Sequence, residues 1–122
     1  MAVSNIPNGV VSYYFSTNTV KEWFDPSLID TSNITSTIEI MNNIAFVRID
    51  HLKIRQPMSN STMIIDGRMP KATQACYARA HNLNFTKSFI MRVFPNDGNL
   101  SLTTAGYNAN DELDPITFSY PI

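Results

Sequence analysis

Apolar and polar side chains alternate along much of this chain, as expected for β-strands that bury one face and expose the other. The clearest case is residues 37–41, which are followed by Asn42-Asn43 and by a second strand-like run at 44–50. Asparagine tolerates the positive φ that a two-residue type I′ turn requires. The pattern therefore predicts a tight hairpin with strands at 37–41 and 44–50.

A second hairpin is predicted in the C-terminal half of the chain. The apolar run at 87–94 ends at the segment 95–99 (Pro-Asn-Asp-Gly-Asn), and strict alternation resumes at 100–103. Proline, asparagine, aspartate and glycine favour turns, so 95–99 is expected to join two antiparallel strands. Further strands are predicted at residues 10–15, 62–65, 73–80 and 116–120.

Two segments allow more than one interpretation. Residues 20–24 form either one helical turn or part of a strand, and the Asp25-Pro26 pair then forces a turn because the residue before proline disfavours the helical conformation. The strand at 44–50 is also consistent with a continuation through Leu52 and Ile54. The alternation of apolar and polar residues is irregular near Asp50 and His51, which is typical of a bulge or an edge.

The spacing of these elements predicts an all-β fold. Roughly seven or eight short strands, separated by turn signals and with no long helical pattern, are typical of an antiparallel β-sandwich or jelly roll. A chain of 122 residues fits one domain. We therefore expect a single β-sandwich domain over 1–122, in which residues 1–36 could serve as an N-terminal linking segment.

The amino-acid composition of the chain argues against some classes of binding partner. Only 16% of the residues are charged and the net charge is −1, so the chain lacks the basic character of a nucleic-acid-binding protein. No apolar run approaches the length of about 18 residues that a membrane helix needs. The first residues contain neither a basic start nor an apolar stretch, so no signal peptide is expected. Asparagine, serine and threonine make the surface polar but nearly neutral.

Few residues stand in patterns typical of catalysis or metal binding. Cys76 is the single cysteine, and its small neighbours predict a buried apolar side chain rather than a nucleophile. His51 and His81 do not have the spacing of metal ligands. The acidic segment 110–114 is expected to be a solvated loop, because nothing pairs its carboxylates as glycoside cleavage requires. We therefore expect no enzymatic activity, no metal and no cofactor.

Several segments of the C-terminal part follow one another in a distinctive order. They are the strand 44–49, the segment 67–70 (Gly-Arg-Met-Pro), the strand of small residues 73–80, the segment 92–102 with its Asp-Gly turn, and the terminal strand 118–121. In order and spacing, residues 37–122 resemble the head domains of bacteriophage tail fibres and baseplate receptor-binding proteins, as in phages of lactic-acid bacteria. Residues 67–70 are similar to that family's proline-containing segment in incomplete form.

The resemblance implies a jelly-roll-like β-sandwich head that assembles as a homotrimer and binds saccharide on the host cell surface during adsorption. Its ligand would be host cell-wall polysaccharide or teichoic acid, its neighbours other tail or baseplate proteins, and its location the virion, at the tail tip or baseplate. The alternative is a structural baseplate or fibre component. In that case the strand 87–94, apolar on both faces, would serve in trimerisation or docking, and truncating Phe89 or Ile90 should give folded monomers.

Candidate ligand-binding residues follow from the chemistry of sugar recognition. Flat aromatic rings provide apolar contact area, and amide, guanidinium, imidazole and carboxylate groups bond to adjacent hydroxyls. Polar side chains and aromatic rings occur together in the segments 79–85 and 106–110. A position in the core is the alternative for Trp23. The candidate saccharide-binding residues are Trp23, Arg79, His81, Asn82, Tyr107 and Asp111.

Overall fold

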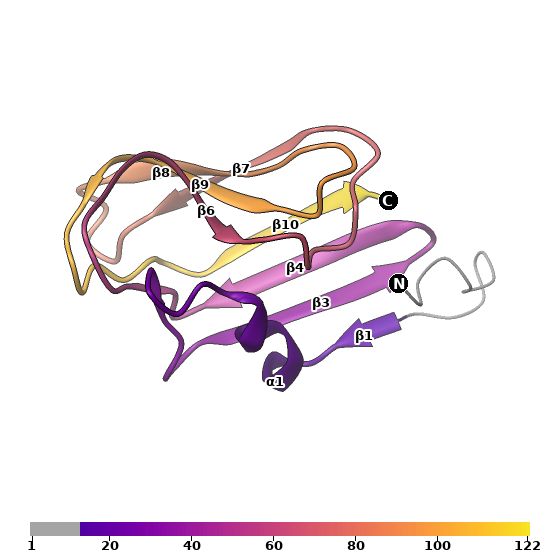
Figure 1. The fold of residues 1–122 in the computed structure, drawn as a ribbon, viewed down its shortest axis with the longest axis horizontal. Coiled ribbons are helices and arrows are strands. Elements are labelled where there is room, and N and C mark those ends of the chain that lie inside the picture. The colour runs from indigo at the N-terminus through magenta and orange to yellow at the C-terminus, as the bar shows by residue number, and fades with distance from the viewer. Residues whose placement is uncertain (1–12) are drawn as a thin grey trace.

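The chain folds as an antiparallel β-sandwich, which confirms the all-β fold predicted from the sequence. The computed structural model describes residues 13–122, and it describes all of their side chains except those of residues 59, 60 and 104–107. Two four-stranded sheets face each other (Figure 1). Sheet A contains, in spatial order, β1 (Tyr13–Phe15), β3 (Thr35–Met41), β4 (Ile44–Asp50) and β10 (Ile116–Pro121). Sheet B contains β6 (Met58–Ile65), β9 (Leu100–Tyr107), β8 (Ser88–Val93) and β7 (Cys76–His81).

The first predicted hairpin is confirmed, and it sets the register of sheet A. Asn42 and Asn43 have φ values of 51° and 62°, and they bring Met41 opposite Ile44. From that pair onward, alternate residues of β3 and β4 point into the core or out to solvent. The inward positions are Ile38, Ile40, Ala45, Val47 and Ile49.

Strand β4 ends at Asp50, so the strand does not continue through residue 54. His51 has a φ of 60°, which turns the chain away from sheet A. Residues Lys53–Ile54 then form β5, which pairs with β2 (Ile29–Asp30) in a separate two-stranded sheet. The irregular alternation near His51 therefore marks the end of the strand, and the predicted continuation through Ile54 is wrong.

Residues 20–24 adopt the helical alternative. The short helix α1 (Thr17–Val20) continues into the 3₁₀-helix η2 (Lys21–Trp23). The turn is closed by the amides of Thr19 and Val20, which donate to the Ser16 carbonyl over 3.1 and 2.9 Å. Phe24 is extended and buried, and it ends the helix before Pro26.

Sheet B is a Greek key, in which β7, β8 and β9 follow as hairpins and β6 lies beside β9. The predicted turn between β8 and β9 is confirmed, with positive φ at Asn96 (66°) and Gly98 (68°). Strand β7 begins at Cys76, later than the predicted start at residue 73, and β9 extends to Tyr107. In β8, Phe89 is only 4% exposed while Ile90 faces outward.

Hydrogen bonds at both sides of the sandwich join the two sheets. On one side, the segment before β7 meets β10: the Thr73 amide donates to the Pro121 carbonyl over 3.0 Å, and the buried Tyr120 hydroxyl donates to the Pro70 carbonyl over 2.8 Å. On the other side, the Asp25 amide donates to the Ile64 carbonyl of β6 over 2.9 Å. The apolar inner faces are thereby enclosed, and both outer faces point to solvent.

Tyr120 makes the stability of the fold sensitive to alkali. Burial raises the pKa of its hydroxyl well above the ordinary value. Above about pH 10 the unfolded chain releases this proton while the folded chain keeps it, so the free energy of unfolding should fall as the pH rises. Tyr120→Phe should cost about 1–2 kcal/mol at neutral pH, because the Pro70 carbonyl loses its donor, and it should make the alkaline decline shallower.

Urea unfolding at neutral pH and above about pH 10 measures both effects. Tyr77→Phe is the matched control, because the Tyr77 side chain is exposed. An equally steep alkaline decline in Tyr120→Phe and in the native protein would contradict this assignment.

Candidate functional site

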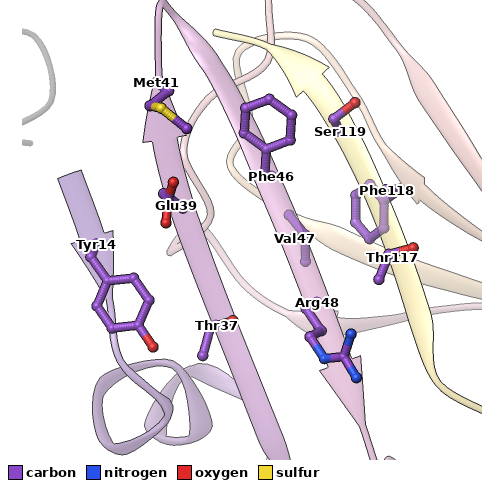
Figure 2. Close-up of a pocket in the computed structure, with 10 residues that line it drawn as sticks. All are labelled: Tyr14, Thr37, Glu39, Met41, Phe46, Val47, Arg48, Thr117, Phe118 and Ser119. Atoms are coloured by element: carbon purple, nitrogen blue, oxygen red, sulfur yellow. The ribbon is translucent and has the colours of Figure 1, made fainter. Parts of the chain in front are cut away.

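The outer face of sheet A contains a shallow groove of about 510 Å³ (Figure 2). Strand pairing aligns Tyr14 of β1 with Glu39 of β3, Glu39 with Phe46 of β4, and Phe46 with Ser119 of β10. These residues form one row across all four strands. A second, parallel row consists of Thr37, Arg48 and Thr117.

Two exposed aromatic rings give this groove its apolar surface. The exposed fraction is 44% for Phe46 and 58% for Tyr14, and Glu39 lies between them. Figure 2 shows the Phe46 ring on the central strand and the Tyr14 ring toward the edge of the sheet. An outward-facing phenylalanine removes apolar area from water only when a ligand or partner covers it. The rings therefore indicate a surface suited to binding.

Charged groups and hydroxyls surround these rings. Arg48 forms an ion pair with Asp50, with 3.0 Å between Nη2 and Oδ2, which orients the guanidinium along the strand. Because Arg48 is largely exposed, the pair contributes little to stability. The Glu39 carboxylate has no hydrogen bond or ion pair with any described residue. With the hydroxyls of Thr37, Thr117 and Ser119, the groove offers both donors and acceptors beside flat rings.

Trp23, one of the two aromatic residues predicted for the site, lies outside this groove. It lines a separate groove of about 350 Å³ together with Glu22, Asp66 and Arg68. Its ring packs edge-on against Phe15, with 5.1 Å between the ring centroids. Trp23 is thus partly covered by the body of the protein, and its remaining exposed surface faces carboxylates and an arginine.

Asn82 and Asp111 lie together at a third hollow, of about 180 Å³. Asn82 is 6% exposed, and its amide donates to Thr86 Oγ1 over 2.9 Å and accepts from the Lys87 amide over 2.9 Å. Asp111 accepts from Lys87 Nζ over 2.8 Å and from the Asn108 amide over 3.0 Å. Both side chains therefore stabilise the turns around them.

The other predicted site residues lie on strands β7 and β9 of sheet B. His81 is adjacent to Asn82, and its ring lies 5.2 Å from that of Phe85. Arg79 is on the outer face of sheet B, opposite Ile90. Tyr107 is the last residue of β9, but its side chain lies outside the described part of the structure. The structure thus brings His81, Asn82 and Asp111 to one end of the sandwich, with Arg79 two residues before His81 on the same face of β7, and it places Trp23 in a separate groove.

The residues of this groove, Tyr14, Glu39, Phe46 and Arg48, are not among the candidates predicted from the sequence. A signal for two of them was present, because a hairpin centred on Asn42-Asn43 places Glu39 opposite Phe46 on the polar face. Phe46 departs from the rule that outward positions of a strand are polar, and a large apolar ring at such a position indicates a binding surface.

No protein-family model and no curated protein matches this chain. Among residues 13–122, no three histidine, cysteine or acidic side chains are grouped as metal ligands would be. None of the helices in that range has the length and hydropathy needed to cross a membrane.

We expect Asn82 to contribute more to stability than Asp111. Asn82→Ala should cost about 1–3 kcal/mol, since it leaves a buried turn without its hydrogen bonds. Asp111→Asn should cost no more than about 1 kcal/mol at neutral pH, because its ion pair is partly exposed.

The two variants also differ in their pH dependence. The hydrogen bond from Lys87 lowers the pKa of Asp111. Its stabilising effect is therefore present above the ordinary aspartate pKa of about 4 and is lost as the pH falls through the lowered value. Urea unfolding should show the Asp111→Asn deficit disappearing in acid while the Asn82→Ala deficit persists. A pH-independent Asp111→Asn deficit would refute the role of its charge.

Proposed function

We propose that this protein is a β-sandwich binding module that holds a cell-surface saccharide on the outer face of sheet A. One observation supports this most directly: the row in which two exposed rings, Tyr14 and Phe46, flank the Glu39 carboxylate. The apolar C–H face of a sugar ring can stack on an aromatic ring while its hydroxyls bond to neighbouring polar groups. Arg48 and the hydroxyls of the second row lie within the same groove.

The shape of the groove favours an extended ligand over a small enclosed one. It is open along a sheet face, and one of its rows crosses all four strands while the other crosses three. Sugars offer little apolar area, so the affinity of one site should be weak. Several copies of the module acting together would raise the avidity without any new contact.

The resemblance of residues 37–122 to phage tail-fibre and baseplate heads supports a biological setting for this activity. In that setting the protein recognises host cell-wall polysaccharide or teichoic acid during adsorption. It belongs to the tail tip or baseplate of the virion, and a homotrimer presents three sites toward the host surface. Neither catalysis nor a cofactor enters into this function.

Substitution of Phe46 tests the proposal. Phe46→Ala should lower the association constant for the recognised wall polysaccharide by about tenfold or more, since an aromatic anchor typically contributes at least 1–2 kcal/mol. Phe85→Ala is the matched control, because Phe85 is more exposed than Phe46 but lies at the end of the sandwich. Calorimetric titration with wall polysaccharides purified from a panel of lactic-acid bacteria provides the measurement.

Two outcomes would overturn the proposal. One is that the native protein, at its native oligomeric mass, binds no member of the panel. The other is that Phe46→Ala and Phe85→Ala weaken binding equally, which would show that the groove on sheet A is not the site.

A structural role is the second candidate, and the half-exposed Ile90 favours it. Ile90 is 37% exposed on the outer face of β8, where a neighbouring molecule could cover it. Phe89 is buried in the core, so its truncation tests folding rather than assembly. Light scattering should then show a multimer that Ile90→Ser dissociates into folded monomers. Such a multimer without saccharide binding would favour the structural role.

A further inference from the structure

The outer face of sheet B differs from that of sheet A in its charge. The strands of sheet B contain Arg79 and Arg92 but no aspartate or glutamate. In the strands of sheet A, by contrast, Glu39 and Asp50 outnumber Arg48. The two outer faces therefore offer different electrostatic surroundings to a ligand.

Arg92 is held across the surface of sheet B. Its guanidinium lies 5.1 Å from the centre of the Phe94 ring, and its Nη2 donates to Ser61 Oγ over 2.7 Å. Ser61 is on β6, so the side chain extends from β8 over β9 to the next strand. A guanidinium fixed in this way loses less conformational entropy when it binds an anion.

Arg79 is the second positive charge of this face. It is exposed, and it forms no ion pair with any residue that the structure describes. Tyr77 of β7 pairs with Arg92 of β8, and Arg79 pairs with Ile90, two residues before Arg92. The two arginines are therefore diagonal neighbours on adjacent strands. The α-carbons of such neighbours lie about 7–8 Å apart. Because the Arg92 guanidinium extends from there toward β6, a ligand that contacts both arginines has to cross several strands, as a polymer can. Tyr77, opposite Arg92, is 59% exposed and adds an aromatic ring.

We infer that the outer face of sheet B is a second binding site, and that it takes an anionic saccharide polymer. Arg79 and Arg92 bind its acidic groups, and Tyr77 packs against a sugar ring. Charge complementarity requires an anion, since these positive charges have no acidic partner on the sheet. A saccharide fits better than an acidic peptide, because the backbone groups of a sheet face are already paired and give a peptide no strand to join.

Matched pairs of polymers test this inference. Polygalacturonate has a carboxylate on each sugar, and its methyl ester has the same backbone without the charge; dextran sulfate and dextran form a second pair. The native protein should bind an anionic polymer about tenfold or more tightly than its neutral counterpart, with affinity that falls as salt is added. If neither anionic polymer binds more tightly than its neutral form, the inference is wrong.

Substitutions locate the binding on the protein. Arg79→Gln, alone and combined with Arg92→Gln, should lower the affinity for the anionic polymer, the double variant by about tenfold or more. Arg55→Gln is the matched control, because Arg55 is similarly exposed but lies outside both outer faces and pairs with Asp30. Arg79→Gln alone is sufficient if the double variant fails to fold, since the exposed Arg79 side chain forms no hydrogen bond or ion pair with any described residue. Equal losses in Arg55→Gln and Arg79→Gln would refute the site.

Two further measurements separate the alternatives. Poly-glutamate bound as tightly as polygalacturonate would overturn the assignment to saccharides. Phe46→Ala, on the opposite face, should leave binding of the anionic polymer unchanged. Failure of the site on sheet A and failure of the site on sheet B would therefore be distinguishable.

Discussion

The pair of left-handed asparagines between β3 and β4 is the constraint on which the rest of sheet A depends. With Asn42 and Asn43 at positive φ, Met41 must lie opposite Ile44, and every later pair follows. A shift of one residue in one strand would turn its apolar side chains to solvent and bury Glu39 or Arg48. The same two-residue turn thus determines both the packing of the core and the composition of the groove.

The two outer faces are chemically separate because the core between them is closed at both sides. Tyr120 and the backbone bonds near Thr73 attach β10 to sheet B, and Asp25 attaches the helical segment to β6. The residues proposed to bind on one face are not shared with the other, so the two proposed sites should bind independently. One molecule could then hold two saccharide chains of the same cell surface at once.

The hairpins were predictable because their determinants are local: an asparagine pair in one, and a Pro-Asn-Asp-Gly-Asn turn in the other. The interruption at His51 was only partly predictable, since the pairing of β5 with β2 involves residues distant in sequence. The row that joins Tyr14 to Ser119 depends on contacts between the two ends of the chain, which no local pattern reveals. Asn82 was a candidate saccharide-binding residue because an amide can both donate and accept hydrogen bonds. In the structure its side-chain amide is already hydrogen-bonded within a turn.

The hydrogen bonds at the two sides of the sandwich affect how the protein behaves at high concentration. Exposed strand edges with unpaired amides and carbonyls are where folded β-proteins recruit one another into aggregates. Here two of the edge strands, β10 and β6, are partly paired with other segments of the same chain: the Pro121 carbonyl accepts from the Thr73 amide, and the Ile64 carbonyl accepts from the Asp25 amide. These carbonyls are no longer open to a neighbouring strand. Contacts between copies along these two edges would therefore have to be made mainly through side chains.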